Sequence, residues 1–322
     1  MSLLVVNDRE ARELLDLESC IEAMAGVLAA LQRGELSMPL RFVFRPRGTD
    51  SLMGFMPAHR SGADSVFSLK EIAIVPANSA RGLDPHQGGV ILHDGETGAL
   101  QALINASAVT EIRTAAVSAL ATRLLARPGS KAVAILGAGV QGRSHIEAMR
   151  AVLDGPEIRI WSRGSERAAT LAKETGVALA ATAAEACAGA DVVCACTSAR
   201  DPILSLDMLA PGAHVNAVGS SIPTTRELTS ELVAAASLFV DRRESTLNES
   251  GDYLFAVEEA GIGAEHIVAE LGELLEGVHP GRRSDDELTV FKSLGIAVED
   301  LAAAELIVRR ARERGIGLEI DF

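Results

Sequence analysis

The sequence has little or nothing of several features that mark other classes of protein. Its few cysteines form no pair of CxxC motifs and no zinc-type spacing with histidine, so we expect buried free thiols, no disulfide framework and no metal site. No run of about 18 apolar residues could span a bilayer. Acidic residues also appear too early in the chain for a signal sequence. These absences predict a folded cytoplasmic protein with no membrane partner.

Positive charge is also scarce. The formal net charge is −14, and lysine occurs only at Lys70, Lys131, Lys173 and Lys292. Arginine is more frequent, but it forms no continuous basic stripe. A phosphate backbone is held by clustered Lys and Arg, so we expect no nucleic-acid partner.

The 322 residues are enough for two domains. Asn7 or Asp8 can cap a first helix, and apolar residues recur at helical steps from Leu17 to a stop at Gly34. Over residues 41–104, short apolar or alternating runs are separated by turn signals. They predict an antiparallel sheet of about five or six strands.

The second half of the chain alternates strands and helices. A helix follows Asn105 and ends at Pro128, and short buried strands then alternate with helices from residue 132 onward. This pattern predicts an α/β fold with a parallel, doubly wound sheet. Near the C-terminus, "TVFKSLGIAVEDLAAAELIVRRARERG" predicts one long helix with Ala297 and Leu301 on its apolar side. That helix could pack on the first domain or on a partner subunit.

A glycine fingerprint follows the first strand of this second half. The run of residues 132–136 is a predicted buried strand, Gly137, Gly139 and Gly142 come directly after it, and a helical pattern begins at once. In a dinucleotide site the first glycine allows a tight turn, the second lets the backbone approach the pyrophosphate, and the third packs helix on strand. The alternative is an ordinary glycine-rich turn between a strand and a helix.

The second strand of that half ends without the acid that often binds the ribose of NAD. The stretch "IRIWSRGSER" places Ser162, Arg163 and Arg167 near this strand end. An acid there would repel a 2′-phosphate, whereas guanidinium groups bind phosphate through paired hydrogen bonds. The pattern therefore predicts NADP(H), with NAD possible. The alternative is a solvated loop with incidental arginines.

Three cations lie in otherwise apolar surroundings of the first half: Arg41, Lys70 and Arg113. Because charged side chains are seldom buried without partners, these three are candidates for binding an anionic ligand. The alternative is that each pairs with a nearby acid such as Glu71 or Glu111.

Several motifs in order carry a resemblance over nearly the whole chain: "MPAHR", "SLKEIAIVPAN", "VTEIRTAAVSALAT", "ILGAGVQG", "HVNAVGSSIPTTREL", "LFVD" and "VFKSLGIAVEDLAAAELI". Together they resemble the ornithine cyclodeaminase/mu-crystallin family, and are closest in motif to its mu-crystallin-like cyclic imine reductases. The resemblance implies a homodimer. It also implies a substrate-binding and dimerisation domain of α+β class with an antiparallel sheet over residues 1–120, on which a C-terminal helix 300–322 packs, and a Rossmann domain over 121–299.

The resemblance also implies roles for individual residues. Arg41 and Arg113 match the arginines that hold the substrate carboxylate, and Lys70 matches the lysine beside the reacting nitrogen. Ser221 stands where cyclodeaminases and the alanine dehydrogenase carry an Asp, so the expected catalytic set is Lys70, Arg41, Arg113 and Ser221. The residues expected to contact the cofactor are Thr114, Gly137, Gly139, Val140, Gln141, Gly142, Ser162, Arg163, Arg167, Thr197, Val218, Lys292 and Ser293.

A hydroxyl is a poor general base near neutral pH, so Ser221 argues against ornithine cyclodeamination. We therefore expect an NADPH-dependent reductase of a small cyclic 2-imino acid, pyrroline-2-carboxylate or piperideine-2-carboxylate. The alternatives are an ornithine cyclodeaminase using NAD, an oxidoreductase of amino acids like alanine dehydrogenase, and a non-enzymatic binding protein.

Overall fold

The chain builds two separate sheets, each within its own compact unit of the computed structural model, which describes residues 2–84 and 86–322. Unit 1 comprises Met1–Arg113 and Ile296–Phe322, and unit 2 comprises Thr114–Gly295. Both boundaries lie a few residues from the expected ones. The first falls inside α3 (Ala106–Leu125), which runs through it without a break. The sequence therefore carries no turn signal at that point.

The sheet of unit 1 has the order β16-β1-β7-β6-β5-β4-β2, with β3 also paired to β4. Neighbouring strands are antiparallel except β1 and β7, which are parallel. The strands predicted between residues 41 and 104 are all present, while β1 and β16 were not predicted. The strand bounds are β1 Ser2–Val6, β2 Leu36–Ser37, β3 Phe42–Phe44, β4 Leu52–Arg60, β5 Val66–Ile74, β6 His86–Asp94, β7 Leu100–Asn105 and β16 Leu318–Asp321.

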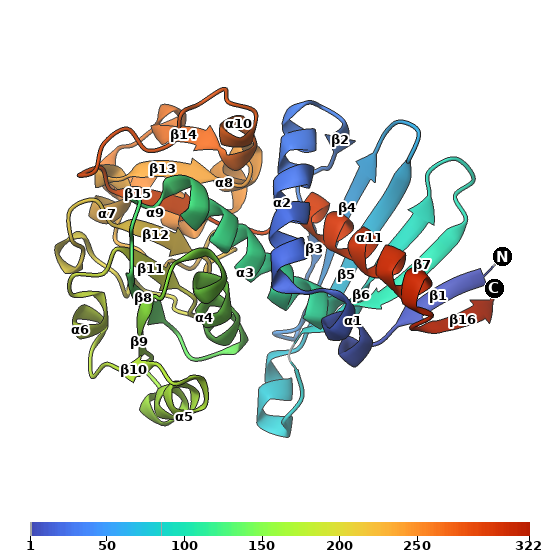
Figure 1. The fold of residues 1–322 in the computed structure, drawn as a ribbon, viewed down its shortest axis with the longest axis horizontal. Coiled ribbons are helices and arrows are strands. Elements are labelled where there is room, and N and C mark those ends of the chain that lie inside the picture. The colour runs from blue at the N-terminus through green and yellow to red at the C-terminus, as the bar shows by residue number, and fades with distance from the viewer. Residues whose placement is uncertain (1, 85) are drawn as a thin grey trace. The chain divides into compact units, whose positions relative to one another are not determined.

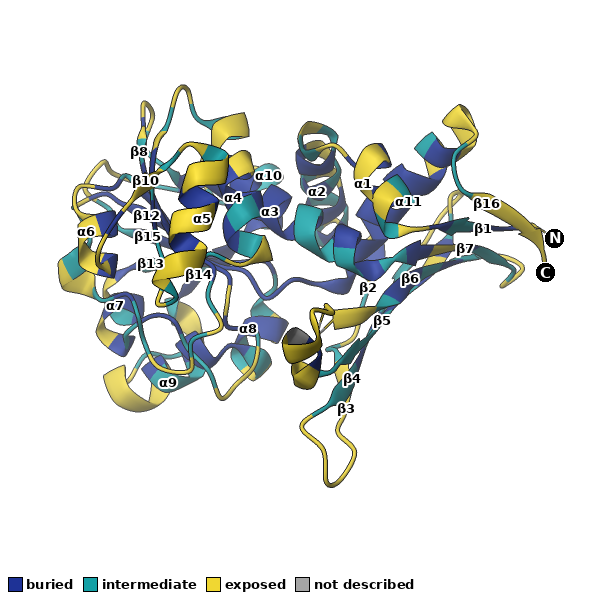
Figure 2. Ribbon diagram, turned by 90° about the horizontal axis from the view of Figure 1, so that it is seen from below, coloured by how far each residue is buried: buried dark blue, intermediate teal, exposed yellow. Residues whose placement is uncertain are grey.

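Helices α1 (Asp8–Leu14), α2 (Leu17–Gln32) and α11 (Ala297–Arg314) lie on one side of this sheet (Figures 1 and 2). Asn7 caps α1 through a capping box with Glu10, as its position in the sequence suggested. A second cap, Asp16, starts α2 separately, so the first helical region is two helices. A short 3-10 helix covers Pro76–Arg81.

The helix predicted over residues 289–315 is wrong at its start and right at its end, whereas the range 300–322 implied by the resemblance is wrong at its end. Thr289–Lys292 forms strand β15 of unit 2, because a short, fully buried run of β-branched and aromatic residues suits a parallel strand. Helix α11 starts at Ala297 and stops before Gly315, which has a left-handed backbone (φ 65°). The residues beyond it form β16, which pairs with β1.

The sheet of unit 2 has the order β10-β9-β8-β11-β12-β15-β13-β14, and its neighbouring strands are all parallel. The order reverses between β8 and β11, which is the switch point of a doubly wound fold. The predicted α/β fold class is therefore confirmed. The strands are β8 Ala132–Leu136, β9 Glu157–Trp161, β10 Ala178–Leu179, β11 Val192–Ala195, β12 His214–Ala217, β13 Ser237–Val240, β14 Ile267–Glu270 and β15 Thr289–Lys292.

The central strands of unit 2 are buried on both faces, as parallel strands covered by helices require. Their apolar side chains form one core with the surrounding helices. These helices are α4 Val140–Val152, α5 Ser165–Thr175, α6 Ala183–Cys187, α7 Ser230–Ala235, α8 Arg243–Glu249, α9 Gly251–Ala260 and α10 Leu271–Leu275, with 3-10 turns at Leu206–Met208 and Ala264–His266.

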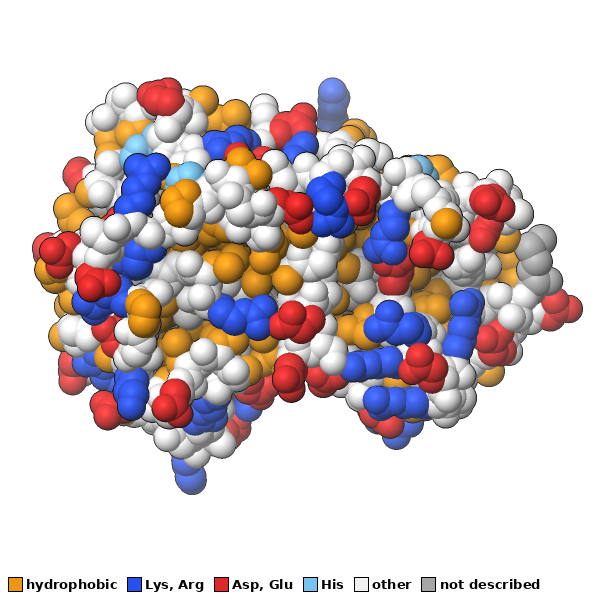
Figure 3. Space-filling model, turned by 45° about the horizontal axis from the view of Figure 1, so that its top comes forward, with side chains coloured by type: hydrophobic (Ala, Val, Ile, Leu, Met, Phe, Trp, Pro, Cys, Tyr) orange, Lys and Arg blue, Asp and Glu red, His pale blue; other side chains and the backbone are white. Residues whose placement is uncertain are grey.

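All four cysteines are free and buried, which confirms that prediction. Burial raises the pKa of the Cys187 thiol to about 11 and that of Cys194 to about 12. Within the described part of the chain, none of the helices is both long and apolar enough to cross a membrane. On the face drawn in Figure 3, the described basic side chains are interspersed with acidic ones.

Candidate active site

Each glycine of the fingerprint has a distinct environment in the loop between β8 and α4. Gly137 has φ 122°, and a Cβ there would lie 2.4 Å from the carbonyl oxygen of Cys196. A Cβ on Gly142 would lie 2.1 Å from the carbonyl oxygen of Gly137, whereas one on Gly139 would meet nothing within 4 Å. The first and third glycines therefore permit a turn and close packing, and the second leaves open space above the backbone.

Helix α4 begins at this open position. Gly139 is its N-cap, and no side chain caps the helix there. Val140 and Gln141 start a helix of 13 residues, whose first amides lack partners within the helix. Such amides and the positive end of the helix dipole bind phosphate. The open cradle and the uncapped helix start fit the pyrophosphate of a dinucleotide.

The end of β9 lies beside this loop. The amide of Gly137 donates to the carbonyl of Trp161 over 2.8 Å, so the residues after Trp161 start next to the glycine turn. Ser162 is half-buried and Arg163 is exposed. Arg167, in the first turn of α5, folds back so that its Nε lies 3.5 Å from a Cβ built on Gly164.

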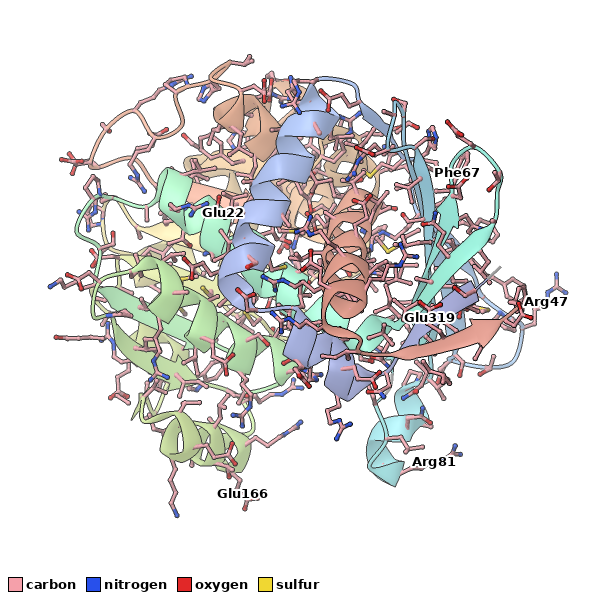
Figure 4. All side chains as sticks on the ribbon, turned by 45° about the vertical axis from the view of Figure 1, so that its right-hand side comes forward. Glu22, Arg47, Phe67, Arg81, Glu166 and Glu319 are labelled. Atoms are coloured by element: carbon pink, nitrogen blue, oxygen red, sulfur yellow. The ribbon has the colours of Figure 1, made fainter. Side chains whose placement is uncertain are left out.

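This strand end also has an acidic neighbour that the sequence analysis did not consider. Glu166 lies in the first turn of α5 and is exposed; Figure 4 labels it on that helix. Ser162, Arg163 and Arg167 are therefore not the only polar side chains at this strand end.

The other expected cofactor residues of unit 2 follow the neighbouring strands. Thr197 follows β11, Val218 follows β12, and Lys292 and Ser293 end β15. Because these strands are parallel, the structure brings all four to the edge of the sheet that carries Gly137. The hydroxyl of Ser293 is buried and has no hydrogen-bond partner among the described residues.

Lys292 is held inside the protein. It is 1% exposed, and its Nζ lies 3.0 Å from Asp252 Oδ2 and 3.2 Å from the carbonyl oxygen of Ala217. Its charge is therefore neutralised by a buried acid. Thr114, the remaining expected cofactor contact, is a buried residue of α3 at the start of unit 2.

Lys70 and Arg113 form a buried ionic cluster in unit 1. Lys70 Nζ lies 2.8 Å from Asp300 Oδ2, and Arg113 contacts Asp300 Oδ1 at 3.0 Å and Glu299 Oε2 at 2.6 Å. All four residues are buried, and the two acids come from the first turn of α11. The positive charges of the two cations are thus balanced by the negative charges of the two acids in a buried region.

This cluster changes the proton affinity of Lys70. Burial lowers the pKa of the Lys70 ammonium, Asp300 opposes this shift, and the positive charges of Arg113 and Arg41 add to it, so that the pKa is about 8. A lysine with such a pKa can hold or release a proton near neutral pH. Arg41 is half-buried and lies near enough to influence Lys70 through its charge.

Ser221 lies in unit 2, in the loop that follows β12. It is half-buried, and its neighbour Ser220 is fully buried with its hydroxyl bonded to Thr225. Ser221 belongs to unit 2, whereas Lys70 belongs to unit 1.

The acids that pair with Lys70, Arg113 and Lys292 or bond to Thr197 were not predicted from the sequence: Glu299, Asp300, Asp252 and Glu227. The expected acid Glu111 pairs instead with Arg12, at 2.7 Å. Acids inside helical or turn patterns normally lie on solvated faces, so spacing gave no signal for them. The one available signal was that a buried lysine requires a buried acid somewhere in the chain.

The chain is similar to known proteins over nearly its whole length. Residues 2–315 match the model of the ornithine cyclodeaminase/mu-crystallin family. The chain is 42% identical over 276 residues to the ketimine reductase mu-crystallin of Mus musculus, with 85% of each protein covered.

Two solved structures are similar over nearly the full length. One is the Delta(1)-pyrroline-2-carboxylate reductase of Thermococcus litoralis in complex with NADH and L-proline, with TM-score 0.93, 32% identity, and 98% of this chain and 100% of that chain covered. The other is an archaeal alanine dehydrogenase dimer with bound NAD, with TM-score 0.93, 29% identity and 100% of both chains covered. The resemblance found in the sequence is confirmed: the chain belongs to the ornithine cyclodeaminase/mu-crystallin family.

Proposed function

We propose that this protein is an NADPH-dependent reductase that converts a cyclic 2-imino acid, pyrroline-2-carboxylate or piperideine-2-carboxylate, to L-proline or L-pipecolate. The observation that carries the proposal is the buried Lys70, with its pKa lowered to about 8, beside Arg113 and under the influence of Arg41. A cyclic imino acid presents an anionic carboxylate next to a basic nitrogen, and this set of cations suits both groups. The similarity to a pyrroline-2-carboxylate reductase over the whole chain supports the same substrate class.

In the proposed reaction Arg41 and Arg113 bind the carboxylate, because guanidinium groups match its geometry. The Lys70 ammonium keeps the imine nitrogen protonated, so that the electron pair of the C=N bond ends on nitrogen as a neutral amine. When bound, the reduced nicotinamide supplies a hydride. Reduction at C2 of the ring would break no bond to a leaving group.

Ser221 supports reduction over cyclodeamination. Closing a ring from ornithine requires a base to take a proton from an amine, and a serine hydroxyl is a poor base near neutral pH. Reduction of a preformed imine has no such requirement.

The choice of NADPH rests on the end of β9. Ser162, Arg163 and Arg167 offer a hydroxyl and two guanidinium groups where a 2′-phosphate would lie in a doubly wound fold. NAD(H) is the second candidate, because the two similar solved structures hold NADH and NAD.

The active form is proposed to be a homodimer built through the sheet of unit 1. The strand side chains that alternate with the helix-covered ones are apolar and exposed: Phe42 63%, Phe44 53%, Phe67 47% and Leu103 38%. An exposed apolar surface of this kind marks a protein interface. The similar archaeal alanine dehydrogenase is described as a dimer, which supports a second copy as the occupant.

A substrate panel tests the activity. Purified protein is assayed for NADPH and NADH oxidation with five- and six-membered cyclic imines, for pyruvate amination, and for ammonia release from ornithine with trace NAD. We expect steady NADPH oxidation with a cyclic imine to be the fastest reaction. Ammonia and proline formed from ornithine at an equal or higher rate would overturn the proposal, and so would the absence of every turnover.

A further inference from the structure

A fully buried carboxylate, Glu227, joins the loops that follow β11 and β12. Its Oε1 accepts hydrogen bonds from the amide of Thr197 at 2.6 Å and from the Thr197 hydroxyl at 2.7 Å. Its Oε2 accepts a hydrogen bond from the amide of Gly219 at 2.6 Å. One side chain thus bonds to the main chain of two separate loops.

A second carboxylate fixes Glu227 in turn. Asp252 Oδ1 accepts from the amides of Glu227 at 2.8 Å and Leu228 at 2.9 Å, and its Oδ2 lies 3.0 Å from Lys292 Nζ. Both acids and the lysine are buried. The group therefore extends beneath the ends of β11, β12 and β15, where Lys292 is the last strand residue.

Both oxygens of Glu227 are occupied as hydrogen-bond acceptors. Both oxygens accept hydrogen bonds from main-chain amides, and an amide nitrogen cannot accept a proton in return. Burial and Asp252 raise the pKa of Glu227, while Lys292 and the Thr197 donors oppose that rise. The loops are thus arranged around the two carboxyl oxygens of Glu227.

Gly219 shows how closely the two loops approach. A Cβ at this residue would lie 1.9 Å from the carbonyl oxygen of Thr197 and 2.5 Å from Glu227 Oε1. Any side chain at Gly219 would push the loops apart, because the first of these atoms belongs to the backbone.

We propose that Glu227 is a positioning residue that holds the Thr197 loop and the loop of Gly219 and Ser221 in the arrangement that receives the nicotinamide half of the cofactor. In a doubly wound sheet the two halves of a dinucleotide lie on opposite sides of the switch point. The strand β9, whose end is proposed to contact the adenosine ribose, lies on one side of the switch point, and β11 and β12 lie on the other side. The inference rests only on the dinucleotide part of the proposed function.

The test compares whole cofactor with a fragment that lacks nicotinamide. Calorimetry measures the Kd of NADPH and NADH and that of ADP-ribose and its 2′-phosphate, in the absence of imine substrate. Glu227→Gln places an NH2 group against an amide donor. We therefore expect this variant to raise the Kd of both dinucleotides by about tenfold or more. Fragment binding should stay within about twofold. Glu270→Gln is the matched control, because Glu270 is a buried acid of the same sheet that accepts a hydrogen bond from the Arg243 amide.

Gly219→Ala is the second variant, because it separates the same loops while keeping the carboxylate. It should reproduce the selective loss of dinucleotide binding. Unchanged dinucleotide binding in a folded Glu227→Gln or Gly219→Ala protein would overturn the proposal, as would an equal loss of fragment binding. A protein that binds cofactor as expected but reduces no imine would contradict the proposed substrate and leave the role of Glu227 standing.

Discussion

At the scale of single residues, the main result is that two of the cations proposed for substrate binding, Lys70 and Arg113, are held by acids from the other end of the chain. Glu299 and Asp300 lie nearly 190 positions from Arg113. The cations could be predicted because a lysine stands inside a strand pattern. Their partners could not, because acids at the start of a helix usually face water and stabilise the helix dipole.

The pH dependence of the reaction should follow Lys70. If the ammonium form is the active one, kcat/KM should fall as pH rises through about 8, the lowered pKa of Lys70. Asp300→Asn removes the charge that opposes this lowering, so the fall should move to lower pH. The measurement is a kcat/KM profile of both proteins with one imine. Identical pH profiles for the wild type and Asp300→Asn would show that Lys70 does not hold the proton on which the reaction depends.

The same pKa also predicts how stability changes with pH. Lys70 binds a proton more weakly in the folded protein, with a pKa of about 8, than in the unfolded chain, with 10.5. Between these values the unfolded state holds more protons, so the Lys70 contribution to the free energy of unfolding increases with pH. Urea titrations of the wild type and Lys70→Met across this range measure the difference. The variant should lack this increase.

Arg113→Ala should reduce both stability and substrate binding. It leaves Glu299 and Asp300 buried with one fewer cation, and removing one partner of a buried pair costs about 3–5 kcal/mol. The KM for the imine should rise more than about tenfold, while the Kd of the cofactor should stay unchanged. Arg12→Ala removes a more exposed ion pair and should cost about 1 kcal/mol at most. A normal KM for Arg113→Ala would make Arg113 purely structural.

At the scale of elements, strands were predicted well where turn residues separate them and poorly where they do not. The strands between residues 42 and 105 are bounded by turns such as "DGETG". By contrast, β1 and β16 pair with each other from opposite ends of the chain, and no local signal encodes such a pair. The strand β15 was predicted as helix because a run as short as Thr289, Val290 and Phe291 fits either structure.

The turn between β9 and α5 should set the cofactor preference. Arg163→Ala should weaken the binding of NADPH far more than the binding of NADH, because a charge-assisted hydrogen bond to the 2′-phosphate contributes about 1.5–3 kcal/mol. Arg159→Ala is the matched control, since Arg159 lies in β9 but bonds to the carbonyl of Ala188. Calorimetry measures the Kd of NADPH and of NADH for each variant. Equal losses for NADPH and NADH would show that Arg163 does not bind the phosphate.

The loop after β12 should tolerate loss of the Ser221 hydroxyl. For a reductase of preformed imines, Ser221→Ala should retain activity within about two decades, the lower end of what a positioned proton-transfer group contributes. Ser221→Asp should lose imine reduction, because its charge repels the substrate carboxylate in a partly desolvated site. Initial rates of imine reduction and ammonia release measure both effects. A Ser221→Asp protein that reduces imine at the wild-type rate would refute this assignment.

At the scale of the whole molecule, the apolar sheet face of unit 1 predicts the assembly. Phe67→Glu places a charge among exposed aromatic residues (Figure 4 labels Phe67) and should convert a dimer to a monomer. Val278→Glu is the control, since Val278 is 66% exposed in unit 2. Sedimentation equilibrium measures both. A Phe67→Glu protein that remains dimeric at low concentration would place the interface elsewhere.

The pairing of β1 with β16 also constrains the order of folding during synthesis. Unit 2 is one continuous stretch, Thr114–Gly295, whereas unit 1 needs Ile296–Phe322 to cover and complete its sheet. Domains usually fold in the order in which they leave the ribosome. Here unit 1 lacks its buried helix α11 and its edge strand β16 until residues 296–322 have been synthesised, after the whole of unit 2. The helix-facing side of the unit 1 sheet is therefore incompletely covered in the nascent chain while unit 2 is already able to fold.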